Sequence, residues 1–447
     1  MRKNDVLDLR AETLGAEMEG VCRFEGMAVF VPGLLPGEEA SVRIVRTEKR
    51  YAFGKAESSP RVPSADRREP DCPVYARCGG CSGRHMSYEA TLQAKRQHVQ
   101  DCFERIGHLT VSVPSVLGME NPRAYRNKTA LPAGGSVSDP QLGFFAPRSH
   151  RLIPAVHCPN AMAPTGKIAE AVLLWMRQFK IPPYDEAAGQ GLLRHLVLRI
   201  NRRQEAMATL VLNGSSLPHA GELITALSSA GVVSLYTNEN QRRTNVIFGS
   251  RFRLIYGRET LTDTLCGLRF DLSPASFFQV NPIQTETLYA KALEFADLHE
   301  SDTLCDVYCG AGTITLTMAR RCRRATGIEI VPSAVENARQ NASRNGITNA
   351  VFHEGKAEDL LPRMVREGLR PSVIVVDPPR KGLEPSVIEA IAEAAPDRLI
   401  YISCNPATQA RDAALLHERN FRIQKIQPVD MFPFTSHVET VVLLSRK

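Results

Sequence analysis

The fold of this chain is decided by the stretch Asp302-Thr-Leu-Cys-Asp-Val-Tyr-Cys-Gly-Ala-Gly-Thr313. Its first half is short and apolar, as is typical of a buried strand, and its two glycines allow a tight turn before a helix over 314–321. Such a strand, turn and helix form the first unit of a Rossmann-like sheet, in which the glycine backbone approaches a ligand closely. The third glycine of dinucleotide-binding spacing is missing. The stretch therefore predicts a doubly wound α/β domain.

Further strands follow, and several of them end at a polar or reactive side chain. The strand 325–330 carries Glu329 near its end, the strand 372–376 leads to Asp377, and the strand 398–403 leads to Cys404. An acid at the end of the second strand can accept hydrogen bonds from both ribose hydroxyls of a nucleotide-like cofactor. The other predicted strands of this sheet cover 351–354, 421–427 and 439–445, and a helix is expected over 332–345. We therefore expect seven strands whose ligand-binding edge holds these three side chains.

Cys404 stands at the end of the strand 398–403, immediately before Asn405 and Pro406. Proline fixes its own φ and biases the residue before it toward extended geometry, so the thiol is held on a stiff turn. Two interpretations follow from position alone. Cys404 is a nucleophile, or it is a buried free cysteine, which is among the most buried residue types.

The front of the chain, residues 16–58, alternates in strand fashion and is broken by glycines and prolines, which predicts a small β-barrel. Basic residues interleave there with Tyr51 and Phe53, a mixture that suits RNA, with phosphates on the cations and bases on the rings. The alternative is a solvated barrel face. The basic residues are Arg43, Arg46, Lys49, Arg50 and Lys55.

Three cysteines, Cys72, Cys78 and Cys81, follow with the spacing C-x5-C-x2-C, and Cys158 stands before a proline far downstream. Three thiolates on one loop with a remote fourth are typical of an iron–sulfur cluster. Zinc is the main competitor, because four cysteines also make a closed structural zinc site. The spacing does not match the paired C-x2-C halves of most zinc ribbons, which favours [4Fe-4S].

Global properties limit the class of protein. A chain of 447 residues is too long for one core and suggests two or three domains. We expect no membrane span and no secretory signal, and hence a cytosolic protein whose 11 cysteines are reduced or metal-bound. The formal net charge of +7 permits an anionic partner but is also compatible with an ordinary solvated surface.

The motifs together resemble the RNA 5-methyluridine methyltransferase family over nearly the whole chain. The matching motifs are Phe277-Phe-Gln279-Val-Asn, Asp306-Val-Tyr308-Cys-Gly-Ala-Gly-Thr313, Glu329, Asp377-Pro-Pro-Arg-Lys-Gly, Ser403-Cys404-Asn-Pro and His437-Val-Glu439-Thr. The front resembles a TRAM domain, an OB-like RNA-binding module, through Val29-Phe-Val-Pro-Gly, Leu35-Pro-Gly-Glu and Tyr51-Ala. The missing glycine and the Asp-Pro-Pro loop favour S-adenosylmethionine over NAD. A TRAM-like front with four cysteines resembles the branch that methylates 23S ribosomal RNA, since the tRNA branch typically lacks both.

The resemblance implies specific roles. Cys404 would be the nucleophile and Glu439 the base. Contacts with S-adenosylmethionine would come from Gln279, Tyr308, Thr313, Glu329 and Asp377. The cysteines Cys72, Cys78, Cys81 and Cys158 would hold the cluster. Lys356 falls near a further family cofactor position at which an uncharged or acidic residue is more usual.

The predicted fold class is α/β, with a Rossmann-like methyltransferase domain, an N-terminal β-barrel and a central α+β domain. The predicted boundaries are 1–60 for the barrel, 61–83 with 115–265 for the central domain, and 84–114 with 266–447 for the methyltransferase domain. We expect a monomer that acts on ribosomal RNA and does not bind a membrane. The competing activities are tRNA 5-methyluridine, RNA 5-methylcytosine and amino-group methylation. A non-catalytic RNA-binding iron–sulfur protein is the alternative from another class.

The chemistry explains why such a site needs a cysteine and a base. Uracil C5 is too weak a nucleophile to take a methyl group unaided, so a thiolate adds to C6 and a base later removes the C5 proton. An ordinary thiol, with a pKa of about 8.5, is only slightly ionised at neutral pH, so the site should be electropositive. Arg380 and Lys381 are candidates to supply that charge, although both also suit a solvated loop.

Overall fold

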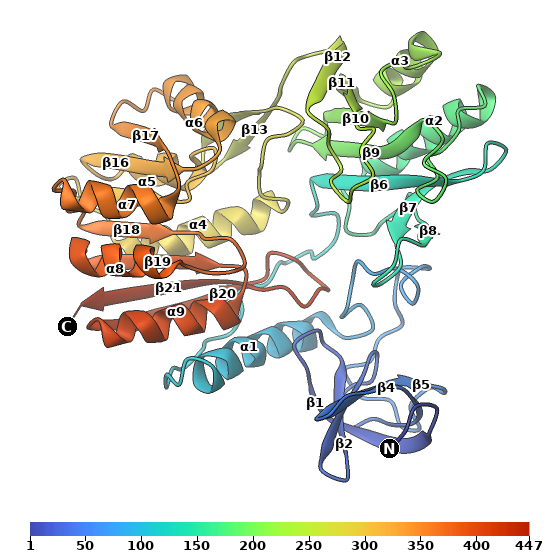
Figure 1. The fold of residues 1–447 in the computed structure, drawn as a ribbon, viewed down its shortest axis with the longest axis horizontal. Coiled ribbons are helices and arrows are strands. Elements are labelled where there is room, and N and C mark those ends of the chain that lie inside the picture. Colours follow the sequence, from blue (N-terminus) through green and yellow to red (C-terminus); the bar gives the residue numbers. More distant parts are fainter. Residues whose placement is uncertain (447) are drawn as a thin grey trace.

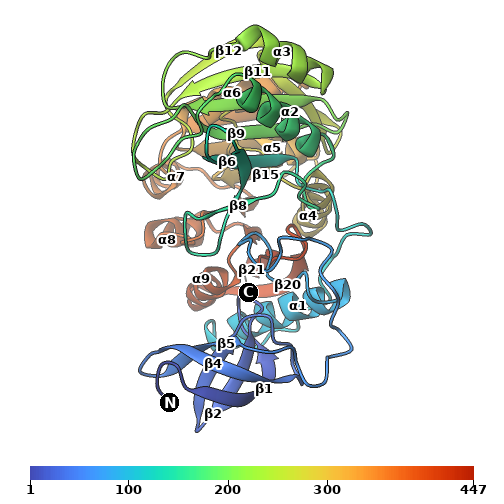
Figure 2. The ribbon, with the colours of Figure 1, turned by 90° about the vertical axis from the view of Figure 1, so that its right-hand side faces the viewer.

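The computed structural model describes residues 1–446, which form a closed barrel, two seven-stranded sheets and a short two-stranded sheet (Figure 1). The barrel lies at one end of the molecule, with helix α1 (Tyr88–Arg105) between it and the C-terminal sheet. The view turned by 90° shows the central sheet at the far end from the barrel (Figure 2). This arrangement confirms the predicted fold class of an α/β domain with a barrel and a central α+β portion.

The barrel has the strand order β1-β2-β3-β5-β4 and a core of inward-facing aliphatic side chains, among them Val29, Val42 and Ile44. Its strands are β1 (Val6–Leu14), β2 (Gly20–Phe24), β3 (Met27–Val31), β4 (Glu39–Thr47) and β5 (Tyr51–Ala56). The first strand begins earlier than the sequence pattern predicts. Only Leu9 and Ala11 of β1 are buried, so its apolar signal is weak.

The central sheet has the order β12-β11-β10-β9-β6-β7-β8. Its strands are β6 (Lys128–Gly135), β7 (Pro140–Phe145), β8 (Leu152–Pro154), β9 (Leu193–Ile200), β10 (Ala206–Leu212), β11 (Val232–Glu239) and β12 (Arg251–Gly257). Helices α2 (Pro164–Gln178) and α3 (Ala220–Ser229) contribute to the core of this sheet. The second is required because β10 and β11 pair in parallel, and a parallel pair needs a crossover connection.

A hairpin of β13 (Leu261–Leu265) and β14 (Leu268–Leu272) leads into the C-terminal sheet, whose order is β17-β16-β15-β18-β19-β21-β20. This confirms the expected seven strands. They are β15 (Thr303–Val307), β16 (Arg324–Glu329), β17 (Ala350–Glu354), β18 (Val373–Val376), β19 (Arg398–Ser403), β20 (Phe421–Val429) and β21 (Glu439–Arg446). The first five in spatial order are parallel, and β21 is antiparallel to both of its neighbours.

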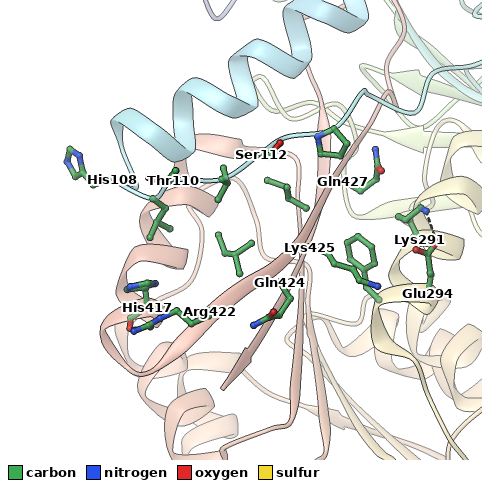
Figure 3. Close-up of a pocket in the computed structure, with 16 residues that line it drawn as sticks. His108, Thr110, Ser112, Lys291, Glu294, His417, Arg422, Gln424, Lys425 and Gln427 are labelled. Carbon is green, nitrogen blue, oxygen red and sulfur yellow. Dashed lines mark hydrogen bonds and ion pairs between the residues drawn. The ribbon is translucent and has the colours of Figure 1, made fainter. Parts of the chain in front are cut away.

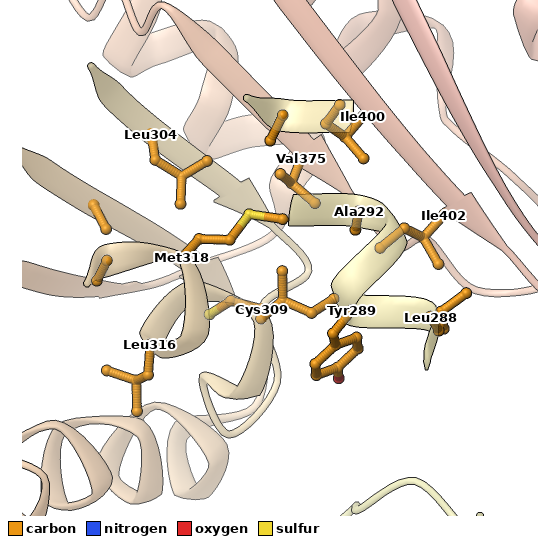
Figure 4. Packing of buried hydrophobic residues seen from close by; sticks show 14 of the residues in the cluster. Leu288, Tyr289, Ala292, Leu304, Cys309, Leu316, Met318, Val375, Ile400 and Ile402 are labelled. Atoms are coloured by element: carbon orange, nitrogen blue, oxygen red, sulfur yellow. The ribbon is translucent and has the colours of Figure 1, made fainter. Parts of the chain in front are cut away.

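Helices cover both faces of the C-terminal sheet. One core layer joins it to α4 (Pro282–Ala296), α5 (Thr313–Ala319) and α6 (Pro332–Arg344), and Figure 4 shows Leu288, Tyr289 and Ala292 of α4 among the side chains of this layer. The other layer contains α1, α7 (Ala357–Arg366), α8 (Pro385–Ala394) and α9 (Pro406–Glu418). Helix α1 thus packs on this sheet although it precedes the central sheet in the chain. With both faces covered, the carboxyl edge of the parallel strands is left for a ligand.

Candidate active site

Cys404 and Glu439 face each other at the carboxyl edge of the C-terminal sheet. Ser403, the last residue of β19, pairs with Thr440 of the antiparallel strand β21. Continuing that register by one residue brings Cys404 opposite Glu439. Cys404 is half-buried, whereas Glu439 is only 5% exposed. The strand pairing therefore places the predicted nucleophile beside the predicted base.

The loop after β18 lies against the turn that carries Cys404. Asn405 caps helix α9 through its side-chain oxygen, which accepts from the Ala407 amide, and its Nδ2 donates to the carbonyl oxygen of Arg380 over 2.9 Å. Thr408 also donates to this oxygen, over 3.2 Å. These bonds hold the Asp377–Gly382 loop at the nucleophile, so the Arg380 guanidinium can act on the thiol.

The surroundings of the thiol are less positive than the chemistry leads one to expect. Burial raises the pKa of Cys404, and the carboxylates of Glu439 and Asp377 raise it further, whereas Arg380 opposes them. Lys381 does not contribute, because its ammonium pairs with Glu384 at 2.5 Å. Of the two predicted cations, Arg380 therefore acts on the thiol, and burial outweighs it.

The two acids at the site are held in a form that favours a bound proton. Burial raises the pKa of Glu439, the neighbouring Asp377 raises it further, and Arg380 lowers it. Burial also raises the pKa of Asp377, with a second contribution from Asp306. A carboxyl group with a raised pKa can accept a proton near neutral pH, which is what a general base requires.

The glycine turn and Glu329 form the second part of the site. Glu329 ends β16, and its carboxylate accepts from the Gly310 amide at 3.0 Å and from the Val331 amide at 2.8 Å. Tyr308 and Gly312 both have positive φ, 72° and 81°, as the chain turns from β15 into α5. The carboxylate is thereby fixed beside the turn, in a position from which it can reach a ribose. Lys356 is exposed immediately before α7.

The remaining predicted cofactor residues flank the same edge. The first residue of α5, Thr313, shares a hydrogen bond of 2.8 Å with the hydroxyl of Tyr289 on α4. Gln279 lies in the loop before α4, and its carbonyl oxygen accepts from Asn127 of the central portion at 3.0 Å. The predicted residues thus gather from β15, β16, β18 and the loop before α4, while the central portion anchors that loop.

Two buried acids support the site without having been predicted as part of it. Asp306 accepts from Thr315 at 2.5 Å, and burial raises the pKa of Asp306 to about 7. The fully buried Asp412 accepts from the Leu383 amide and from the Tyr401 hydroxyl, both at 2.7 Å. Asp306 belongs to the motif in the first quoted stretch. Asp412 sits in an ordinary helical pattern, so nothing in the sequence marks its role.

The four predicted cluster ligands converge on one cavity of about 320 Å³. Cys72, Cys78, Cys81 and Cys158 all line it, together with Arg84, Arg126 and Lys128. Burial raises the pKa of Cys78, and the nearby thiols of Cys81, Cys158 and Cys72 add to that effect. Within residues 1–446, however, no group of three or more His, Cys, Asp or Glu side chains is arranged to hold a metal ion. The thiols therefore share a cavity without the arrangement of a metal site.

A larger cavity, of about 780 Å³, lies away from this chemistry (Figure 3). It is lined by the segment after α1, by α4 and by β20, and none of the predicted catalytic or cofactor residues reaches it. Its charged groups include the pair Lys291 and Glu294, and Lys425, which stands over the ring of Phe295. Size alone does not identify the functional site here.

Comparisons with known proteins agree with the geometry. Residues 249–447 match the model of the tRNA (Uracil-5-)-methyltransferase family, and residues 2–56 match the TRAM domain. The chain is 42% identical over 448 residues to an uncharacterized RNA methyltransferase of Clostridium tetani, covering 100% of this chain and 97% of the relative. It is 43% identical over 437 residues to one from Caldanaerobacter subterraneus, covering 97% of this chain and 96% of the relative.

A solved structure extends the likeness to the whole fold. The tRNA (uracil-54, C5)-methyltransferase of Pyrococcus abyssi, in complex with S-adenosyl-L-homocysteine, aligns with a TM-score of 0.78 and 26% identity. The alignment covers 98% of this chain and 100% of that one.

The chain is therefore an RNA methyltransferase whose methyl donor is S-adenosylmethionine. More particularly, it belongs to the tRNA (Uracil-5-)-methyltransferase family and carries an N-terminal TRAM domain. These findings confirm the predicted family, the RNA-binding front and the methyl donor. Among the described residues, no helix is long and apolar enough to cross a membrane.

Proposed function

We propose that this protein forms 5-methyluridine in 23S ribosomal RNA, with Cys404 as the nucleophile and Glu439 as the base. The observation that carries the proposal is the register of β19 and β21, which sets Cys404 opposite Glu439 at the ligand-binding edge. A thiol and a buried carboxyl group on adjacent strands are the two groups that uracil C5 methylation needs.

The reaction follows from these two side chains. The Cys404 thiolate adds to C6 of the uracil, which makes the ring an enolate whose C5 carries the electron pair. S-adenosylmethionine, when bound, would supply the methyl group: C5 would take it as the sulfonium–methyl bond breaks, and S-adenosylhomocysteine would be the leaving group. Glu439 then takes the proton from C5, and the C6–S bond breaks to release 5-methyluridine and the thiolate. Arg380 stabilises the thiolate at both ends of this cycle.

The cofactor contacts are proposed residue by residue. Glu329, already oriented by two backbone amides, would accept hydrogen bonds from the ribose hydroxyls. Asp377 follows β18, between the glycine turn and Cys404, where the methyl group must pass from the donor to the uracil ring. Gln279, Tyr308 and Thr313 would complete the binding surface.

Support for ribosomal RNA comes from the combination of a TRAM barrel with four cysteines on one cavity. The Pyrococcus abyssi neighbour acts on uracil 54 of tRNA, so tRNA is the competing substrate. The deciding experiment maps 5-methyluridine in ribosomal RNA and tRNA from a strain lacking the gene. Loss of the modification from 23S RNA with intact tRNA supports the proposal, and loss from tRNA alone overturns it. Action on ribosomal RNA would also place the protein in the cytoplasm.

We further propose that Cys72, Cys78, Cys81 and Cys158 bind a [4Fe-4S] cluster. The four thiols and no other cysteine line the cavity of about 320 Å³, and the cations Arg84, Arg126 and Lys128 at its wall offset the negative charge of thiolate ligands. Binding of the cluster would have to draw the four thiols together, because in the described residues they are not arranged around a metal ion. We also propose that residues 61–83 and 115–265 form one domain, and that residues 84–114 and 266–447 form another. Within this division, the cluster would brace the connection between the barrel and the central sheet.

A further inference from the structure

Loop 430–438, which joins β20 to β21 and ends immediately before Glu439, is fixed by a buried ion pair. Lys95 of α1 and Asp430 at the start of the loop form a salt bridge whose two side chains are both 0% exposed. The other carboxylate oxygen of Asp430 accepts from the Tyr88 hydroxyl at 2.6 Å. That hydroxyl accepts in turn from the Met119 amide at 2.9 Å. Every polar atom of this group thus has a partner inside the protein.

A continuous chain of hydrogen bonds leads from this ion pair toward the base. Lys95 also donates to the carbonyl oxygen of Phe432 at 3.0 Å. The same oxygen accepts from the Thr435 hydroxyl at 2.8 Å and from the Thr435 amide at 3.1 Å. The Thr435 hydroxyl accepts from the amide of His437 at 3.3 Å. His437 stands two residues before Glu439, where the loop enters β21.

Other parts of the molecule hold the loop from its sides. The amides of Ser82 and Gly83 both donate to the Phe434 carbonyl at 3.0 Å, and the Ser436 amide donates to the Ser82 hydroxyl at 3.0 Å. The Ser436 hydroxyl donates to Glu17 of the barrel at 2.9 Å. The loop therefore has a fixed course from Asp430 to the strand that begins with Glu439.

Stability alone does not explain a dry ion pair at this place. Desolvation of two charges costs about as much as their attraction returns, and apolar side chains of similar volume are often as stable or more so. A charged pair differs from an apolar pair because its hydrogen bonds are directional. They hold the two segments that the pair joins in a defined geometry.

We propose that Lys95 and Asp430 are positioning residues for catalysis, and that they set the place of Glu439 through Phe432, Thr435 and His437. They touch neither RNA nor methyl donor in this role. The inference rests on the proposed function, in which Glu439 removes the C5 proton. A displaced carboxylate would slow that step and leave the earlier steps intact.

Thr435 offers the sharpest test, because it is the one link of the path that can be cut without disturbing the ion pair. Thr435→Val keeps the side-chain shape and removes the hydroxyl, whereas Thr435→Ser keeps the hydroxyl. We expect Thr435→Val to lower kcat about tenfold or more, since small misplacement of a catalytic group is costly, with unchanged KM for RNA and S-adenosylmethionine. Thr435→Ser should be close to wild type in kcat.

Two further readouts separate positioning from simple destabilisation. Thr435→Val should accumulate a methylated RNA adduct on Cys404, and the His437 amide should exchange its hydrogen faster than in Thr435→Ser. The double variant Lys95→Met/Asp430→Leu should repeat the kcat loss and the adduct while keeping the melting temperature of the wild type.

Wild-type kcat in Thr435→Val overturns the inference, as does a kcat loss that comes with a matching fall in melting temperature and no faster exchange at His437. Glu439→Gln is run in parallel to test the proposed function. If Glu439→Gln forms no adduct, the assignment of the base has failed, and the inference is then decided by kcat and by exchange at His437. The inference stands only if kcat and the hydrogen exchange at His437 both change in Thr435→Val and both return to the wild-type values in Thr435→Ser.

Discussion

The side chain of Asn405 donates to the carbonyl oxygen of Arg380 over 2.9 Å, and this bond joins the turn of the nucleophile to the loop whose Arg380 lowers the pKa of the thiol. Asn405 also caps helix α9. One residue thus fixes the start of a helix and the distance between a thiol and a guanidinium.

The first prediction concerns Arg380. Arg380→Gln removes the charge that lowers the pKa of Cys404, so the thiol pKa should rise by up to about one unit. Alkylation of Cys404 by iodoacetamide at pH 7, followed by mass spectrometry of its peptide, should slow by up to about tenfold. Lys381→Gln is the matched control, because Lys381 pairs with Glu384 and should leave the rate unchanged. Equal rates in Arg380→Gln and wild type would remove Arg380 from this role.

The second prediction separates nucleophile from base. Cys404→Ala should abolish methylation while RNA still binds, because no covalent route remains. Glu439→Gln should stall after methyl transfer, so a denaturing gel with RNA and labelled S-adenosylmethionine should show a slow band that carries the label. The band should be absent from the Cys404→Ala/Glu439→Gln double variant. Turnover at the wild-type rate by Glu439→Gln would mean that another group removes the proton.

The third prediction concerns Glu329. Glu329→Ala should weaken binding of S-adenosylmethionine by about ten- to a hundredfold in calorimetry, since hydrogen bonds to a charged group are lost, with RNA affinity nearly unchanged. Glu354→Ala is the control, because Glu354 is the exposed register partner of Glu329 at the end of β17. Similar affinity in the two variants would place Glu329 outside the cofactor site.

The fourth prediction concerns the cysteine cavity. Protein purified without oxygen should be brown and contain about four irons per chain, as expected for one [4Fe-4S] cluster. Cys158→Ser should lose most of this iron, whereas Cys266→Ser, which lies outside the cavity, should keep it. Stoichiometric zinc without iron would contradict the cluster.

The fifth prediction concerns pH and stability. Burial raises the pKa of Glu439, so the folded protein holds a proton that the unfolded chain releases. The stabilisation from that proton is complete below the unfolded pKa and is lost as pH rises through the folded one. Between about pH 5 and pH 8 stability should therefore fall by up to about 1.4 kcal/mol per pH unit for each such proton.

Urea unfolding at several pH values measures this slope. Glu439→Gln should reduce it without abolishing it, because Asp377 and Asp306 have pKa values raised in the same direction by burial. An unchanged slope in Glu439→Gln would show that Glu439 is ionised in the folded protein.

The sequence predicts the C-terminal sheet well because its central strands β18 and β19 are largely apolar runs, each followed by a marked residue, Asp377 or Cys404. It predicts the barrel less completely, since β1 buries little, and it misses α3, which is needed only because two strands pair in parallel. Such features depend on pairing across the fold, and local pattern does not contain them.

The site divides in the same way. Glu329 and Asp377 are predicted because they stand at the ends of strands. Asp412 and Lys95 acquire their roles only from partners elsewhere in the chain, the Leu383 amide and the Asp430 carboxylate. The raised pKa of Cys404 is missed for a related reason. Burial is its largest cause, and burial depends on how segments from several parts of the chain pack around the thiol.

The early position of α1 in the chain has a consequence for synthesis. Its Tyr88 and Lys95 bond to Asp430 across 342 and 335 residues, so the helix leaves the ribosome long before its partners exist. The barrel and the central sheet can close while the nascent chain is still growing, because domains fold as units in the order of their synthesis. Helix α1 must meanwhile keep Val99 and Phe103 uncovered. A chain that stops before β20 would therefore present the apolar side of this helix with no surface to receive it, and would depend on chaperones until translation ends.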